Sequence, residues 1–344
     1  MDLAQFDYQL PAELIAQEAL EDRAAARMLV IDRQRQSWHD SHFRELPSFL
    51  RPTDALIAND TRVFNSRLIG QRRGHTGRVE VFLTKPLSDD GRLWDALVRP
   101  GRKLLTGTVI DFSADLWATI REHGLHGHRT VELVAEGDLH EILERIGHTP
   151  LPPYIHRPDR ADDRDRYQTL FARERGSVAA PTAGLHFTPE VLAACQATGA
   201  GFATVTLHVG LGTFESLHSE TVEENALHSE SFHVPQATVD LSRKAERVVG
   251  LGTTAVRALE SASRSGELEA ASGETTIFIY PGYEFRTVNA MLTNFHLPKS
   301  SLLLMVCAFG EQELMLAAYR HAVESRYRTM DVFGTRWCGP GASC

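Results

Sequence analysis

The sequence of 344 residues contains little cysteine and no long apolar run. Its four cysteines, at 195, 307, 338 and 344, form no CxxC pair, so we expect free thiols of a reducing compartment and neither a zinc site nor a disulfide framework. The longest strongly apolar run, residues 302–309, is far too short to span a bilayer. The start MDLAQFDYQL lacks the basic and apolar regions of a secretory signal. We therefore expect a cytoplasmic protein with no membrane contact.

The chain also lacks an excess of basic residues, since its formal net charge is -9. Nucleic-acid binders are usually basic, so this charge argues against RNA as a partner. Phosphate contacts need only a local basic face, however. Between positions 62 and 103 such a face is available from Arg62, Arg67, Arg72, Arg73, Arg78, Lys85, Arg92, Arg99, Arg102 and Lys103. A solvated strand surface is the alternative interpretation of this segment.

Short alternating segments, separated by glycine-rich breaks, fill residues 66–135 and predict a small antiparallel sheet or barrel. They are RLIGQRR, GRVEVFLTK, RLWDALVRP, GTVIDF and RTVELVAE. A helix is predicted over residues 139–146, where Gly147 stops it. From about residue 200 the pattern changes to alternating strands and helices, which is typical of an α/β domain. The predicted strands there are FATVTLHV, RVVGLG and TTIFIY, and the predicted helices are TTAVRALESA, SSLLLMVCAF and ELMLAAYRHAVESRY.

The segment DALIAND, before residue 60, reads as a further buried strand of that α/β domain. The predicted fold is an α/β main domain with an inserted small antiparallel β-barrel domain. Residues 1–65 and 149–344 would form the α/β catalytic domain, and residues 66–148 the inserted barrel-like domain.

Four segments have a composition that core packing does not explain. In residues 176–188, GSVAAPTAGLHFT, small residues let the backbone approach a ligand, and Thr188 begins a helix whose N-terminus attracts an anion. The strand of residues 206–214 runs into a glycine-rich turn. Residues 249–257 match the GxGxxA pattern after a strand, but the acid that a dinucleotide site requires about 20 residues later is missing. Residues 292–300 place polar side chains ahead of an apolar helix, where they could bind a ligand or cap the helix.

Two histidine clusters suggest metal binding as an alternative. His228, Glu230 and His233 have mixed ligand types, and His208 could join them. The cluster HGLHGH at 123–128 reads as a polar turn. Neither cluster has two histidines spaced on one helix face, as the common zinc enzymes do. A metal-dependent hydrolase therefore stays an alternative, as does a non-catalytic RNA-binding protein that uses the basic segment.

Taken together, these segments resemble one family. The strings that carry the resemblance are LPPYIHRP, RYQTLFA, GSVAAPTAGLHFT, TLHVGLGTF, ALHSESF, VVGLGTTAVRALES, IFIYPGY and LTNFHLPKSSLLLMV, with FDYQLPAELIAQ and IANDTRVFNSRLIG nearer the N-terminus. They are similar, in order and over roughly residues 5–328, to the S-adenosylmethionine:tRNA ribosyltransferase-isomerases of queuosine biosynthesis. The chain departs from the family pattern at Ala24 and Ala26, after residue 214, and in its C-terminal tail.

The resemblance implies a monomeric enzyme that acts on tRNA carrying 7-aminomethyl-7-deazaguanine in the anticodon. S-adenosylmethionine would donate a rearranged ribosyl unit to that base at the wobble position, giving epoxyqueuosine and releasing adenine and methionine. A base must remove a proton beside the sulfonium, and adenine must leave with help from a proton donor, which suits histidine or carboxylate. No metal is expected, because the donor itself carries the electrophile.

From the motifs and the resemblance we predict His186, His208 and Glu230 as catalytic residues. The predicted substrate-binding residues are Asn59, Asp60, Arg62, Tyr154, Thr182, Gly184, Thr188, Gly210, Gly212, Thr213, His228, Gly252, Thr253, Thr254, Arg257, Asn294, His296 and Lys299. The loops 181–188, 208–213 and 252–257 are expected to meet on one face of the α/β domain. Arg257 would pair with the methionine carboxylate, the alternative being an ordinary surface arginine.

Overall fold

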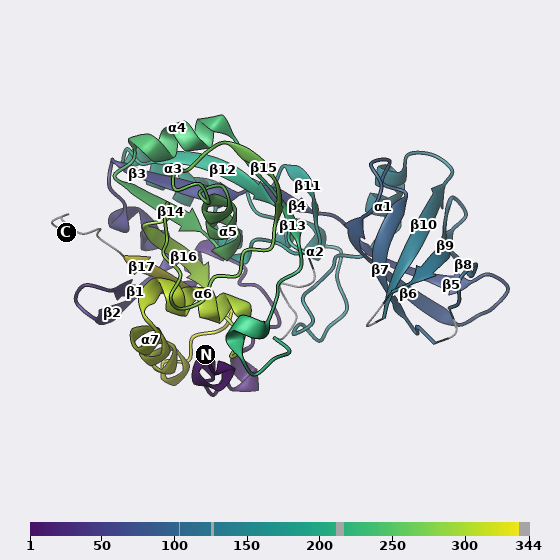
Figure 1. Cartoon of the computed structure of the whole chain (residues 1–344), viewed down its shortest axis with the longest axis horizontal. Coiled ribbons are helices and arrows are strands. Elements are labelled where there is room, and N and C mark those ends of the chain that lie inside the picture. The colour runs from purple at the N-terminus through teal and green to yellow at the C-terminus, as the bar shows by residue number, and fades with distance from the viewer. Residues whose placement is uncertain (103, 125–126, 211–216, 337–344) are drawn as a thin grey trace.

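The computed structural model describes residues 1–102, 104–124, 127–210 and 217–336. Two bodies are visible in Figure 1, a large sheet with its helices and a separate barrel joined to it by two adjacent segments. The large sheet has nine strands in the order β15 (Ala271–Thr275), β13 (Glu230–Val234), β12 (Gly201–Leu207), β3 (Asp54–Asn59), β14 (Arg247–Leu251), β16 (Ala290–Asn294), β17 (Val332–Arg336), β1 (Arg27–Asp32) and β2 (Ser37–His42).

The four strands β12, β3, β14 and β16 run parallel to one another. Strand β13 pairs antiparallel with β12, β15 with β13, β17 with β16 and β2 with β1, whereas β1 and β17 pair in parallel. Parallel strands are covered on both faces, so they read as almost continuous apolar runs. Strand β3 shows this, because every one of its residues is buried. Ala55 and Ile57 face one hydrophobic cluster, and Leu56 and Ala58 face the other.

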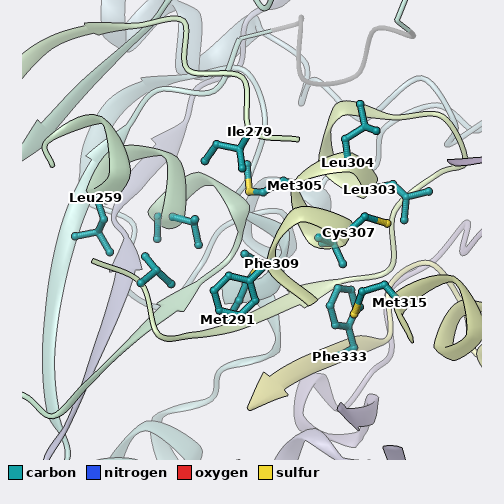
Figure 2. Close-up of a cluster of buried hydrophobic side chains, with 14 of the residues drawn as sticks. Leu259, Ile279, Met291, Leu303, Leu304, Met305, Cys307, Phe309, Met315 and Phe333 are labelled. Atoms are coloured by element: carbon teal, nitrogen blue, oxygen red, sulfur yellow. The ribbon is translucent and has the colours of Figure 1, made fainter. Parts of the chain in front are cut away.

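Helices cover both faces of the sheet. The first cluster joins it to α5 (Thr253–Ser261), α6 (Ser301–Gly310) and α7 (Gln312–Glu324). In Figure 2 side chains from α5, α6 and α7 converge with Met291 of β16 and Phe333 of β17. The second cluster joins the sheet to α3 (Pro189–Ala197) and the 3-10 helix η4 (Phe43–Phe49). The remaining helices are α2 (Asp163–Arg166), α4 (Gln236–Lys244), η1 (Leu3–Phe6), η2 (Ala12–Leu14), η3 (Arg23–Ala25), η5 (Thr182–His186) and η7 (Val222–Glu224).

The barrel is closed by six antiparallel strands in the order β10-β7-β6-β5-β8-β9. Their bounds are β5 (Arg67–Arg72), β6 (Arg78–Pro86), β7 (Leu93–Arg99), β8 (Val109–Ser113), β9 (Leu116–His123) and β10 (His128–Ala135), followed by α1 (Leu139–Ile146). The two segments that join the bodies pair as parallel strands, β4 (Thr61–Val63) and β11 (Glu174–Ser177). Phe64 and Val178, next to these strands, belong to the barrel's hydrophobic core and so anchor it to the sheet body.

The predicted fold class, an α/β body with a small antiparallel barrel, is confirmed. The helix over residues 139–146 and its stop at Gly147 are confirmed as well. Other details were wrong. Strand β9 of the barrel was not predicted, nor were β1, β2, β13, β16 and β17 of the large sheet. The predicted strand TTIFIY is irregular after Thr275, where β15 ends. Ile277 and Ile279 are buried in the first cluster without strand pairing, so their apolar character comes from packing.

Within the described residues no single helix is long and apolar enough to cross a membrane. Helices α6 and α7 meet the requirement of length and composition only as a pair that is bent by 117°. Cys195 and Cys307 are free, buried thiols, as expected, and burial raises the pKa of each to about 12. Cys338 and Cys344 lie outside the described residues.

Candidate active site

A cavity of about 180 Å³, here called the sheet-edge cavity, lies where β14 and β16 end. Ligands of α/β proteins bind at the carboxyl ends of the parallel strands. The loops that were expected to meet do so here, because Pro181, Thr182, Ala183, Val209 and residues 252–254 all line this cavity. Tyr154 and residues 293–300 complete most of the wall.

Asn294 lines this cavity, and hydrogen bonds to neighbouring residues fix the orientation of its side-chain amide. Its Nδ2 lies 3.0 Å from His186 Nε2, 3.0 Å from the carbonyl of Met330 and 3.3 Å from that of Asp331. All three partners accept hydrogen bonds, so the nitrogen must point towards them and Oδ1 away from them. The Oδ1 atom is buried and has no hydrogen-bond partner within the described residues.

His186 lies behind Asn294 and is not among the residues that line the cavity. Its Nδ1 is 3.4 Å from the carbonyl of Arg23, and its Nε2 accepts from Asn294. Burial lowers the pKa of His186 to about 4, so the ring is neutral at pH 7. Both ring nitrogens are therefore engaged within the protein.

A second cavity of about 540 Å³, here called the barrel-side cavity, lies between the barrel and the sheet body. The barrel contributes Thr84, Lys85, Pro86, Asp95 and His128, and the sheet body contributes Arg175, Gly176, His208, Val209, Gly210, His228, Ser229, Glu230, Ser231 and Glu274. Lys85 forms a 3.1 Å ion pair with Glu274 across this space. Val209 lines both cavities, so the two spaces adjoin at this residue.

His208 lies at this junction, directly after β12. Its Nδ1 is 2.7 Å from the hydroxyl of Thr61, which in turn lies 3.4 Å from the carbonyl of Glu174. If the hydroxyl donates to that carbonyl, Nδ1 carries the proton and Nε2 is left as an acceptor; we assign this tautomer. Burial lowers the pKa of His208, while the charges of Asp60 and Glu174 act in the opposite direction. A neutral imidazole next to a cavity can accept a proton.

Glu230, at the start of β13, is the buried acid of the junction. One carboxylate oxygen accepts from the backbone N–H of Gly210 at 2.8 Å, and the other pairs with the guanidinium of Arg257. The predicted partner of Arg257 was a ligand carboxylate, but the structure shows a carboxylate of the protein in this role. Arg257 accordingly lies beside a much smaller cavity of about 10 Å³, which His228 and Glu230 also line.

Comparison with known proteins shows the family to which the chain belongs. The model of the family described as queuosine biosynthesis protein matches residues 3–335. The chain belongs to this family. A relative from Solibacter usitatus, named S-adenosylmethionine:tRNA ribosyltransferase-isomerase, is 58% identical over 344 residues, which cover 95% of this chain and 97% of the relative. The crystal structure of an S-adenosylmethionine tRNA ribosyltransferase from Thermotoga maritima is similar with a TM-score of 0.54 and 34% identity, covering 96% of this chain and 99% of that one. The resemblance read from the sequence is thus confirmed, and the chain is identified as an enzyme of the queuosine biosynthesis family.

Several of the predicted substrate-binding residues lie away from both cavities and hold the fold of this family member together. Asn59 bonds the backbone of Leu207 through both ends of its amide. Asp60 accepts from the hydroxyls of Thr204 and Thr206 and from Arg173. Arg62 is exposed on β4, Gly184 packs on Thr169 and Phe171, and Thr188 caps α3 through the N–H of Val191. Gly212 and Thr213 lie outside the described residues.

The other predicted residues line one of the cavities. Burial raises the pKa of Tyr154 to about 12 and lowers that of His296 to about 3, so both are neutral at pH 7. Lys299 forms a 2.7 Å ion pair with Asp7. Gly252 has a φ of +88°, which a residue without a side chain adopts easily, at the N-cap of α5. Thr182, Gly210, His228, Thr253 and Thr254 complete this group.

The residues that suggested a metal site do not all lie together. Only His233 is remote: it is exposed on β13, with its Nδ1 2.6 Å from the hydroxyl of Ser272, whereas His208, His228 and Glu230 line the barrel-side cavity. In the part of the chain that the structure describes, no group of three or more His, Cys, Asp or Glu residues is arranged to hold a metal ion.

Three residues at the barrel-side cavity or beside it were missed by the sequence reading. Thr61 positions His208, and on the barrel wall His128 Nδ1 lies 2.7 Å from the carboxylate of Asp95. Thr61 belongs to the string IANDTRVF, so its motif was visible even though its role was not. Asp95 and His128 lie on different barrel strands, and only the strand pairing brings them together.

Proposed function

We propose that this enzyme transfers and isomerises the ribosyl moiety of S-adenosylmethionine onto 7-aminomethyl-7-deazaguanine at the wobble position of tRNA. The products would be epoxyqueuosine in the tRNA, adenine and methionine. One observation carries the proposal: a small cavity and a large one adjoin at Val209, with His208 and Glu230 at the junction. A reaction between a small donor and a base that belongs to a macromolecule needs one confined space and one wider space.

The confined sheet-edge cavity would hold the donor and the barrel-side cavity the modified base. His208 would act as the base, with Nε2 accepting a proton from the carbon beside the sulfonium, since Thr61 holds its other nitrogen. The bond from the ribosyl carbon to adenine breaks with its electron pair going to adenine, which takes up a proton. The amine of the deazaguanine forms a new C–N bond and loses a proton. The carbanion beside sulfur expels the ring oxygen, addition of the amine to the resulting alkene restores the carbanion, and this carbanion bonds the former glycosidic carbon to close the carbocycle. The oxygen on that carbon then forms the epoxide by displacing sulfur, and the carbon–sulfur pair goes to sulfur, so methionine leaves as a neutral thioether.

The tRNA would lie against the barrel and across the barrel-side cavity. Ten basic residues occur between positions 62 and 103, and five of them belong to barrel strands: Arg67, Arg72, Arg78, Lys85 and Arg99. Lys85, one of these ten, and Arg175 of β11 bring cationic groups to the cavity itself. These groups suit a polyanion, although the whole chain is acidic. We further propose that the enzyme works as a monomer in the cytoplasm and needs no metal.

The deciding experiment is adenine release from S-adenosylmethionine, followed by chromatography, with tRNA that carries the deazaguanine amine and with tRNA that lacks it. We expect adenine and methionine to appear in equal amounts, and only with the amine-bearing tRNA. Absence of adenine in both samples would contradict the proposal. Stoichiometric zinc in the purified protein would then favour a hydrolase, and RNA binding that ignores S-adenosylmethionine would favour a non-catalytic RNA-binding protein.

A further inference from the structure

Two buried side-chain oxygens of the sheet-edge cavity have no hydrogen-bond partner within the described residues. They are Oγ1 of Thr254 and Oδ1 of Asn294. The residues are 6% and 3% exposed, respectively. Buried polar atoms are almost always hydrogen-bonded in folded proteins, and the exceptions call for an explanation. Since both residues line the same cavity, a ligand in that cavity can supply the missing partners.

The two oxygens lie where the neighbouring parallel strands β14 and β16 end. Asn294 is the last residue of β16, and Thr254 lies in the first turn of α5, which follows β14. The N–H of Gly252 donates to the carbonyl of Leu292 at 2.7 Å, which fixes the start of α5 against β16. This hydrogen bond therefore fixes the position of Thr254 relative to Asn294.

The two groups have opposite preferences for charge. Helix α5 has nine residues, and no side chain caps its N-terminus. The first N–H groups of a helix lack partners inside the helix and carry a partial positive charge, so they attract a carboxylate. The Thr254 hydroxyl can donate to the same carboxylate. Asn294 offers the reverse, because three acceptors hold its Nδ2 and leave Oδ1 as a fixed acceptor, which suits an ammonium group.

We propose that this end of the sheet-edge cavity binds the α-amino acid group of S-adenosylmethionine. The carboxylate lies against the first turn of α5 and the Thr254 hydroxyl, and the ammonium group donates to Asn294 Oδ1. The inference rests on the proposed function and adds the orientation of the donor to it. Arg257 is not available to the carboxylate, because it does not line the sheet-edge cavity and its Nη1 pairs with Glu230. In this orientation the sulfonium and ribosyl groups of the donor would lie in the part of the cavity near Val209, where the barrel-side cavity begins.

Thr254→Val tests this assignment, because it removes the hydroxyl and keeps the shape of the side chain. Binding is measured by calorimetry without tRNA, using S-adenosylmethionine and, as the matched ligand, 5′-methylthioadenosine, which lacks the amino acid group. We expect about tenfold to a hundredfold weaker binding of S-adenosylmethionine, the range for losing one hydrogen bond to a charged group. Binding of methylthioadenosine should not change, and Thr254→Ser, which restores the hydroxyl, should restore the affinity.

Equal weakening for both ligands, or none for either, would overturn the assignment. The variant should fold normally, because the hydroxyl has no partner in the described protein; a thermal unfolding midpoint equal to that of the parent checks this. Failure of the proposed function is a separate outcome. In that case S-adenosylmethionine would bind as described, and no adenine would be released in the presence of the amine-bearing tRNA.

Discussion

The carboxylate of Glu230 and the guanidinium of Arg257 form an ion pair in which each side chain is only 4% exposed. The pair joins the first residue of β13 to the middle of α5. Glu230 also holds the N–H of Gly210, so the same carboxylate fixes the backbone just after His208. A buried charge pair is thus placed directly beside the junction of the two cavities.

Arg257→Met should destabilise the fold strongly. The substitution leaves the Glu230 carboxylate buried without its cation, and breaking a buried pair in this way typically costs about 3–5 kcal/mol. Urea unfolding at neutral pH measures the loss. The matched control is Arg243→Met on α4, where the guanidinium is half exposed and 3.9 Å from Glu267, so that a change below about 1 kcal/mol is expected. Equal effects of the two substitutions would show that burial of the pair is unimportant.

His208→Gln should lower turnover by about 10²–10⁴, the usual contribution of a general base. Donor affinity should be largely retained. In the parent enzyme, activity requires the neutral imidazole and therefore falls as the pH is lowered. Because burial lowers the pKa of His208, this fall should be centred below pH 6.5 and should vanish in the variant. The control is His233→Gln, which is exposed on the next strand of the sheet. Wild-type turnover in the His208 variant would exclude the assignment.

Gly176→Ala should reduce turnover through His208. An added Cβ would lie 2.8 Å from the imidazole, and the φ of +149° at this position also disfavours a side chain. We expect kcat to fall while KM for S-adenosylmethionine changes little, because the imidazole moves and the sheet-edge cavity does not. Gly266→Ala is the control, since its φ is +120° but no atom lies within 4 Å of the added Cβ. Steady-state kinetics of both variants separate displacement of the ring from backbone strain alone.

The stability of the protein should fall as the pH is lowered from about 6.5 to 4, partly through His186. Its pKa is lowered to about 4 by burial in the folded state, whereas an unfolded histidine titrates near 6.5. Between these values the unfolded chain binds more protons, so the free energy of unfolding decreases with decreasing pH. His186→Gln should flatten the pH dependence of urea unfolding in this window. An unchanged slope between pH 6.5 and 4 would contradict the burial of this neutral ring.

Arg72→Glu and Arg73→Glu on the barrel should weaken tRNA binding and reduce its dependence on salt, since each lost phosphate contact releases fewer counterions. Lys103, another residue of the basic segment and a third candidate for this charge reversal, lies outside the described residues. Arg73 already pairs with Asp111 at an exposed site, so the larger effect is expected at Arg72. Filter binding across a salt series measures both effects, with Arg243→Glu on the sheet body as control. Unchanged affinity would mean that tRNA binds elsewhere.

Periodicity predicted the elements in which burial and secondary structure coincide. The helix over residues 139–146 and the buried strand β3 are examples. Strand β15 could not be found in this way, because it is a polar edge strand that exists through its pairing with β13. The apolar residues just after it, Ile277 and Ile279, looked like a strand and are instead buried by packing alone. The pattern of apolar residues in a sequence predicts which residues are buried, but it does not predict strand pairing, which depends on distant parts of the chain.

The candidate site could be predicted as a set of loops but not as a set of contacts. The sequence indicated that three loops meet, and residues from all three line the sheet-edge cavity. It could not show that Arg257 is neutralised by Glu230, 27 residues earlier, since that depends on how α5 packs against β13. Nor could it separate His208, beside a cavity, from His186, whose ring is enclosed, because both follow similar runs of small residues.

The order of strands in the large sheet also determines when the protein can fold during synthesis. Strand β3 leaves the ribosome before the barrel, but both of its sheet neighbours, β12 and β14, come after the barrel in the chain. Strand β1 pairs with β17, which is made last. The barrel, whose strands are contiguous in sequence, can close while β3 still lacks both of its neighbours and β1, already paired with β2, lacks β17. The nascent chain therefore carries the apolar strand β3 unpaired until β12 is made, and an exposed strand of this kind can aggregate.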